Sequence, residues 1–155
     1  MRLISLIAAA AFAAVPAGAF DLTGTWEGSF NCSRFDGEKD KFTQNGVLLI
    51  TQTGTALNVE WVGLSDLEGI AIYDTKKPDE KGQAALIDCT TTNDLTAAGS
   101  YAEITSLKVK ANRAKGKGSL KGTSVYSEDG ISAGQCKWNF KLTNTADPLV
   151  AATCP

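Results

Sequence analysis

The sequence predicts an all-β protein, an eight-stranded antiparallel up-and-down barrel that carries disulfide bonds. Turn residues recur at short, regular spacing from Gly24 to Asp147, and the segments between them alternate apolar with polar side chains. That alternation is typical of strands in a sandwich or barrel and does not follow the period of a helix. Short connections between successive strands favour an up-and-down order, in which closure of the sheet removes both exposed edges.

The first predicted strand shows the alternation most clearly. Leu22, Trp26 and Phe30 share one parity. Thr25 and Glu27 share the other, so one face of the strand belongs to the core and the other faces water. The eight predicted strands are residues 22–32, 46–53, 56–62, 67–74, 82–90, 101–112, 118–127 and 135–143.

Turn chemistry separates the later strands. Residues 53–55, Thr-Gly-Thr, join the second and third strands in a hairpin, and residues 77–79, Lys-Pro-Asp, end the fourth. Residues 116–118, Gly-Lys-Gly, join the sixth and seventh strands, and residues 129–130, Asp-Gly, precede the eighth. Residues 95–105 alternate least regularly, and their alanine content also fits a short helix.

All four cysteines are expected to form disulfides. They are Cys32, Cys89, Cys136 and Cys154. An even number of cysteines in an exported chain indicates a disulfide framework. A metal site is disfavoured because the four are far apart, no C-x-x-C pair exists and no histidine can assist.

The barrel favours one of the three possible pairings. Closure pairs the first strand antiparallel with the eighth, which brings the end of the first at Cys32 beside the start of the eighth at Cys136. Both residues have the inward parity of their strands. We therefore predict Cys32–Cys136 and Cys89–Cys154, and the second bond would pin the tail, residues 147–155, against the barrel. A Cys32–Cys89 bond would contradict the closure argument.

Residues 1–19 have the pattern of a secretory signal. An apolar run from Leu3 to Val15 follows Met-Arg, and Ala17 and Ala19 give the small-residue cleavage site of a signal peptide. The run is shorter than the roughly 20 apolar residues that span a bilayer, so we expect no transmembrane span. The mature chain, residues 20–155, is then a single barrel domain that is secreted or periplasmic in a bacterium.

The opening of the first strand resembles the calycin barrels, namely the lipocalins and avidins. Residues 22–26 read Leu-Thr-Gly-Thr-Trp. In lipocalins a G-x-W at this place puts a tryptophan at the closed end of the barrel, and Gly24 and Trp26 match it. The resemblance covers about five residues and implies a lipocalin-like barrel. Beyond them the chain departs from avidins, because residues 27–30 are not the polar residues that hold biotin.

A second resemblance concerns the small periplasmic inhibitors of bacterial metalloproteases. The chain is similar to them in size, export signal, predicted barrel topology and the early G-x-W. Those inhibitors insert a mature N-terminal segment into the protease cleft, whereas only Phe20 and Asp21 precede the first predicted strand here. The resemblance implies a protein-binding module as an alternative function.

The chain contains no histidine, which excludes Ser-His-Asp and Cys-His nucleophile pairs and histidine metal ligands. A pair of carboxylates could still hydrolyse a glycoside. The candidates are Glu27, Glu60, Glu103, Asp74 and Asp88. Glu27 and Glu60 have the solvent parity, and the facing of the other three is ambiguous. We therefore expect no enzymatic activity, no cofactor and no metal site.

Charge is distributed unevenly along the chain. The formal net charge is −2, and removal of Arg2 with the signal makes the mature chain more acidic, which argues against nucleic acid as a partner. Residues 108–121 nevertheless carry basic side chains and no acid. Such a basic hairpin could meet an anionic surface or an acidic partner, and a solvated outer face explains it equally well.

The inward parity mixes large aromatic side chains with glycine and serine. A barrel of eight strands either fills its interior or holds one small ligand. We predict a non-enzymatic barrel that binds a small apolar or amphipathic molecule in its mouth. The candidate ligand-binding residues are Trp26, Trp61, Tyr126 and Trp138. The alternative is a protein-binding module, such as a periplasmic protease inhibitor or a cell-envelope interaction protein.

Overall fold

The computed structural model of the chain describes residues 20–35, 41–77, 80–89, 101–150 and 154. The predicted signal at residues 1–19 and residues 95–100 of the least regular segment lie outside them. The strands are β1 (Gly24–Arg34), β2 (Lys41–Thr53), β3 (Ala56–Trp61), β4 (Ser65–Tyr73), β5 (Lys81–Asp88), β6 (Tyr101–Asn112), β7 (Lys117–Glu128) and β8 (Ile131–Asn144). A 3-10 turn, Arg113–Lys115, joins β6 to β7. No helix in the described part of the chain is long and apolar enough to cross a membrane.

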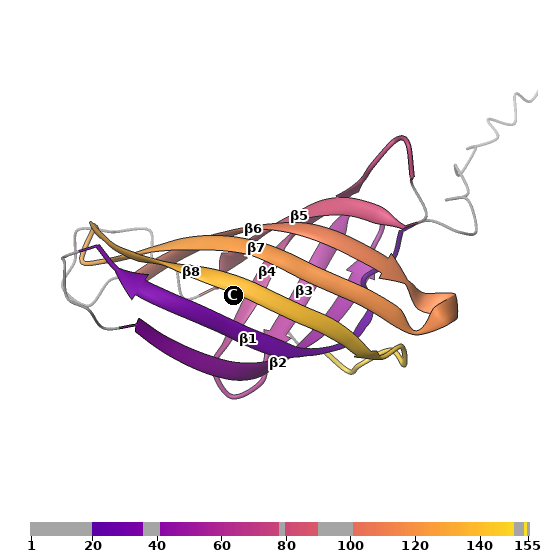
Figure 1. Cartoon of the computed structure of the whole chain (residues 1–155), viewed down its shortest axis with the longest axis horizontal. Coiled ribbons are helices and arrows are strands. Elements are labelled where there is room, and N and C mark those ends of the chain that lie inside the picture. Colours follow the sequence, from indigo (N-terminus) through magenta and orange to yellow (C-terminus); the bar gives the residue numbers. More distant parts are fainter. Residues whose placement is uncertain (1–19, 36–40, 78–79, 90–100, 151–153, 155) are drawn as a thin grey trace, which may run out of the picture.

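The eight strands form a closed antiparallel barrel, which confirms the predicted fold (Figure 1). Each strand pairs with the next one along the chain, and β8 pairs back onto β1. Neither edge of the sheet is therefore left unpaired. The β7–β8 connection is the predicted Asp-Gly turn, in which both Asp129 and Gly130 have positive φ.

Five strands extend beyond their predicted limits at the same end of the barrel, β4 and β7 only slightly and β1, β2 and β8 as follows. β1 continues to Arg34, β2 begins at Lys41 and β8 begins at Ile131. Residues 41–45 are exposed on both parities, so the alternation that marks a strand is absent there, although β1 pairs with β2 as far as Lys41. Residues 101–105, the described part of the segment that also fitted a short helix, belong to β6.

Unequal strand lengths make the two ends of the barrel different. β3, β4 and β5 contain 6, 9 and 8 residues, whereas the other strands contain 11 to 14. The β5–β6 pairing ends at Ile87 and Ile104, and β6 continues past it to Tyr101. We call this end, on the left in Figure 1, the mouth. The opposite end, where β1 begins and Arg113–Lys115 lies, is the closed end.

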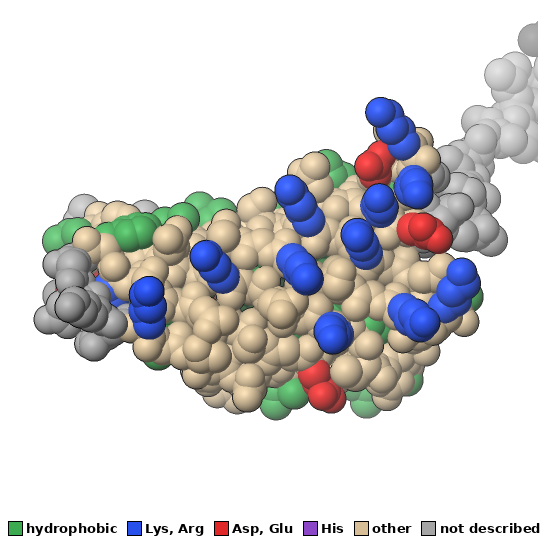
Figure 2. All heavy atoms as spheres, in the orientation of Figure 1, with side chains coloured by type: hydrophobic (Ala, Val, Ile, Leu, Met, Phe, Trp, Pro, Cys, Tyr) green, Lys and Arg blue, Asp and Glu red, His purple; other side chains and the backbone are tan. Residues whose placement is uncertain are grey.

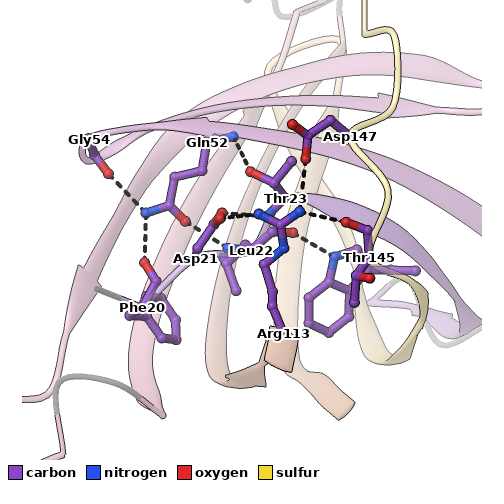
Figure 3. A network of polar contacts seen from close by, with 10 residues as sticks. Phe20, Asp21, Leu22, Thr23, Gln52, Gly54, Arg113, Thr145 and Asp147 are labelled. Atoms are coloured by element: carbon purple, nitrogen blue, oxygen red, sulfur yellow. Dashed lines mark hydrogen bonds and ion pairs between the residues drawn. The ribbon is translucent and has the colours of Figure 1, made fainter. Parts of the chain in front are cut away.

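The closed end is filled by residues 20–23, which precede β1. Phe20 and Leu22 are buried there, and the Trp26 Nε1 donates a hydrogen bond to the carbonyl of Leu22 at 2.8 Å. Gln52 of β2 holds the segment, since its Nε2 donates to the carbonyl of Phe20 at 3.1 Å and its Oε1 accepts from the N–H of Leu22 at 3.0 Å (Figure 3). Phe20 and Leu22, just after the predicted signal, are therefore part of the barrel core.

Arg113 ties the same segment to the end of β8. Its guanidinium pairs with Asp21, donates to the carbonyl of Thr145 and pairs with Asp147 at 2.8 Å (Figure 3). Burial alone lowers the pKa of Arg113, but the hydrogen bonds and charges of Asp21 and Asp147 outweigh it and raise that pKa above its ordinary value. The guanidinium stays charged and links the segment before β1 to the segment after β8.

Glycine makes room for the large rings of the interior. A Cβ on Gly118 would lie 2.5 Å from Cη2 of Trp26, and a Cβ on Gly46 would lie 2.5 Å from Nε1 of Trp61. Each ring therefore packs directly on backbone. The inward parity predicted for the strands is confirmed by the buried set, which includes Trp26, Phe30, Trp61, Tyr126, Trp138 and Phe140.

Both predicted disulfides are present. Cys32 and Cys136 are direct partners across the β1–β8 seam, with their Cα atoms 3.9 Å apart, so this bond joins the first and last strands. Cys89, just after β5, is bonded to Cys154 in the tail. The predicted connectivity is therefore correct. The second bond fastens the tail to the mouth end of β5.

Candidate functional site

A cavity of about 540 Å³ lies at the mouth of the barrel. All eight strands or their ends contribute lining residues, and the Cys32–Cys136 bond lies in its wall. The volume falls within the roughly 300–1,000 Å³ of small-molecule sites. The cavity exists because β3, β4 and β5 stop short at this end, so the interior is not capped by their side chains.

One side of the cavity, contributed by β1, β2 and β3, is aromatic. Phe30 packs edge-on against Phe42 and Trp61, with ring centroids 5.9 and 4.5 Å apart. Trp138 of β8 lies deeper, 4.8 Å from the Trp61 ring, and its Nε1 donates to Ser124 Oγ at 2.9 Å. We call Phe30, Phe42 and Trp61 the aromatic wall.

The other side, contributed by β5, β6 and β7, is acidic. Asp88 and Glu103 line the cavity although they are only 5% and 6% exposed. Asp88 follows the last paired residue of β5 and so lies at the level of Glu103 on β6. Tyr101 donates a hydrogen bond to Glu103 Oε2 at 2.6 Å and stacks on Tyr126, with ring centroids 6.2 Å apart. We call Asp88, Tyr101, Glu103 and Tyr126 the acidic wall.

The Tyr101 phenol is held in its protonated form. Burial raises its pKa well above the ordinary value, and so do the hydrogen bond to Glu103 and the negative charges of Glu103 and Asp88. The phenol is therefore a permanent hydrogen-bond donor at physiological pH, and it orients the Glu103 carboxylate within the cavity.

The rim of the cavity combines one ion pair with exposed apolar side chains. Arg34 and Glu128 form a pair at 3.3 Å, and both are well exposed. Phe42 and Leu64 are 49% and 52% exposed and also line the cavity. Large apolar side chains exposed beside a cavity often mark a binding surface rather than a packed core.

Two buried polar atoms in the described part of the chain have no hydrogen-bond partner. They are Trp61 Nε1, in the aromatic wall, and Thr105 Oγ1, on β6. Thr105 is 0% exposed and lies two residues deeper than Glu103, on the same inward face of β6. Buried polar groups nearly always have a hydrogen-bond partner. These two atoms therefore show that hydrogen-bonding capacity is left unused in and beneath the cavity.

The four tryptophan and tyrosine residues predicted to bind a ligand do not lie together. Trp61 and Tyr126 line the cavity from its two sides. Trp138 lies beneath Trp61, and Trp26 fills the closed end. Parity predicts that a side chain faces inward, but not how deep it lies along the barrel axis.

The acidic wall was only partly visible in the sequence. Glu103 and Asp88 are among the candidate carboxylates of the sequence, but the alternation of apolar and polar residues does not show which way they face. The inward parity of Leu107 and Val109 on β6, extended backward through Thr105, reaches Glu103. On β5 the parity of Ala84 and Leu86 likewise reaches Asp88, so continuing each strand's parity into polar residues would have found both.

A second hollow, a groove of about 620 Å³, lies on the outer surface over the ends of β4 to β7. Lys81, Lys108, Lys110 and Lys121 line it. Figure 2 shows basic side chains spread over the outer face of β6, β7 and β8, with few acidic ones at its margin. The lysines of the basic hairpin are therefore solvent-facing, whereas its Arg113 pairs with Asp21 and Asp147 at the closed end.

No three described Cys, Asp or Glu side chains converge closely enough to hold a metal ion. The mouth can instead offer an organic ligand an apolar surface on one side and carboxylates and phenols on the other. Compared with protein-family models, with curated proteins and with solved structures, the chain matches none of them.

Proposed function

We propose that the protein is an exported, non-enzymatic barrel that binds a small apolar or amphipathic molecule in its mouth. The observation that carries the proposal is the cavity of about 540 Å³, open at the rim and lined by the aromatic wall. Two disulfides support export, because such bonds persist in oxidising compartments.

The position of residues 20–23 does not favour the protease-inhibitor alternative. An inhibitor of that kind needs a free segment ahead of the barrel. Residues 20–23 are instead buried or hydrogen-bonded in the closed end, where Gln52 and Arg113 hold them. A ligand in the mouth requires no such segment.

A neutral hydrophobic fluorophore, N-phenyl-1-naphthylamine, should bind the protein saturably at one site. Trp61→Ala should raise its Kd about tenfold, because removal of a buried aromatic anchor costs on the order of 1–3 kcal/mol of binding. The measurement is a fluorescence titration. Tyr73→Ala, which removes an exposed aromatic ring away from the mouth, is the matched control and should leave the Kd unchanged.

Two results would contradict the proposal. One is the absence of saturable binding by the unchanged protein. The other is an equal loss of affinity in Trp61→Ala and Tyr73→Ala, which would place the fluorophore outside the cavity.

A second candidate function, contact with an anionic cell-envelope surface, is favoured by the outer face of β6 to β8. Lys108 and Lys121 are direct partners across the β6–β7 ladder. Like charges at directly opposed positions destabilise a sheet, so this pair opposes folding. Lys141 faces Glu27 across the β1–β8 seam and is partly balanced. A patch of uncompensated lysines is suited to phosphate groups.

The pair Lys108→Glu and Lys121→Glu should weaken binding to phosphatidylglycerol vesicles at least about tenfold, since each basic residue near an anionic surface contributes about 1 kcal/mol. Co-sedimentation at low salt measures it. Lys76→Glu with Lys77→Glu makes the same change in net charge in the β4–β5 turn and should have a smaller effect. Equal effects of the two pairs would show that only net charge matters, and this second function would then be rejected.

A further inference from the structure

We propose that the ligand of the mouth is a cation, an amphipathic molecule with a protonated amine that lies against Asp88 and Glu103 while its apolar part covers the aromatic wall. This inference rests on the proposed function and adds the charge and chemical class of the ligand. Four observations on the cavity carry it.

The first is the burial of the two acids. Asp88 and Glu103 are more than nine-tenths buried, and both line the cavity. Taking a carboxylate out of water costs free energy unless a charge or several hydrogen bonds compensate it. Deeper on the same face of β6, the chain places Leu107 and Val109, so apolar residues fit this face. Glu103 accepts a hydrogen bond from the neutral phenol of Tyr101 and forms no ion pair with a described residue, so a positive group in the cavity would compensate its burial.

The second is the charge balance of the cavity. Among the described residues that line it, Asp88, Glu103 and Glu128 are acidic and Arg34 alone is basic. Arg34 lies at the rim, where it pairs with Glu128 at 3.3 Å. The interior of the cavity therefore carries an excess of negative charge, which attracts a cation and repels an anion.

The third is the aromatic surface around the acids. The rings of Tyr101 and Tyr126 stack beside Glu103, and Trp61 and Phe30 form the opposite side of the same cavity. Aromatic faces attract cations through their quadrupole, most strongly where water is excluded. The same rings offer an apolar surface to the hydrocarbon part of the ligand.

The fourth is independent of the acids. Thr105 Oγ1 is fully buried and has no partner among the described residues, two positions deeper than Glu103 on the inward face of β6. A protonated primary amine has three N–H donors. Two of them can meet carboxylates, and the third would point down the inward face of β6 toward Thr105, which lies beneath the residues that line the cavity. A quaternary amine has no N–H to donate to this oxygen.

Isothermal titration of the unchanged mature protein with three probes of equal chain length tests the inference. The probes are octylammonium, 1-octanol and octanesulfonate at neutral pH. Octylammonium should bind about tenfold more tightly than 1-octanol, because charge-assisted hydrogen bonds exceed neutral ones, and octanesulfonate should bind most weakly. Glu103→Gln and Asp88→Asn should each weaken octylammonium binding about tenfold. Both variants keep side-chain size, and binding of 1-octanol should be unchanged.

Glu68→Gln, on the exposed outer face of β4, is the matched control and should change none of these affinities. Equal affinity for all three probes would overturn the cationic ligand and leave the proposed function standing, whereas absence of binding by all three would overturn both. If a variant fails to fold, the inference is tested by the ratio of octylammonium affinity to octanesulfonate affinity in the unchanged protein. A ratio near one or below rejects the inference.

Discussion

Replacement of both Cys32 and Cys136 by alanine should lower the free energy of unfolding by about 4 kcal/mol. The bond spans 104 residues of sequence, and in the chain-entropy model a cross-link across a loop of that length removes a large part of the freedom of the unfolded chain. It also joins β1 to β8, the pairing that closes the barrel. The expected loss is large for a domain of this size, whose total stability is on the order of 5–15 kcal/mol. Urea denaturation without reductant measures it.

The matched control is replacement of Cys89 and Cys154 by alanine. The Cys89–Cys154 bond closes a loop of 65 residues, and in the same model it removes nearly as much entropy from the unfolded chain as the Cys32–Cys136 bond does. That bond, however, fastens a tail outside the strands, and the tail can become free in the folded state when the bond is absent. The loss should therefore be about half as large or smaller. If the two double variants lose equal stability, the special role assigned to the β1–β8 seam is wrong.

Trp26→Ala should lower the free energy of unfolding by about 3–5 kcal/mol, the range for truncation of a large buried aromatic side chain. The Trp26 ring is fully buried at the closed end, lies directly on the backbone of Gly118 and donates a hydrogen bond to Leu22. The segment that bonds its indole is held by Gln52 and Arg113, so we expect the cavity left by truncation to close only in part. Thermal or urea denaturation measures the effect.

Trp26→Phe should lose less, about 1–2 kcal/mol, because it keeps most of the ring and removes the hydrogen bond. This variant also separates structure from binding. Trp26 lies at the closed end, so Trp26→Phe should leave fluorophore binding at the mouth unchanged, whereas Trp61→Ala weakens it. A loss of affinity in Trp26→Phe without a loss of folded protein would place the ligand deeper than the mouth.

The fold was predictable because its determinants are local. Strand parity placed Cys32 and Cys136 on inward faces, and barrel closure placed them side by side, which selected the pairing that the structure contains. Strand ends at the mouth were less predictable. Residues 41–45 are exposed on both parities, so hydrophobic alternation cannot mark them as strand. They are strand because they pair with β1, the strand that precedes them, and not because of an alternation of their own.

The candidate site was predictable only in part. Parity identified Trp61 and Tyr126 as inward residues, and both line the cavity. Parity also predicted Trp26 as a ligand-binding residue, because parity does not show where a residue lies along the barrel axis. That position depends on the register of all eight strands. The facing of Asp88 and Glu103 is ambiguous in the sequence because hydrophobic alternation is not informative at charged residues. Burial of a carboxylate is a property of the assembled barrel, not of a strand.

The seam between β1 and β8 also affects how the chain folds as it is made. Synthesis delivers β1 first and β8 last, so residues 24–34 are complete on one side long before residues 131–144 emerge. Until then one row of β1 backbone groups has no partner and can pair with a strand of another molecule. The contacts that join the first and last strands also lie far apart in sequence, which slows folding. The incomplete chain is therefore most exposed to aggregation just before its last strand arrives, and whatever shields that first strand during synthesis protects the yield of folded protein.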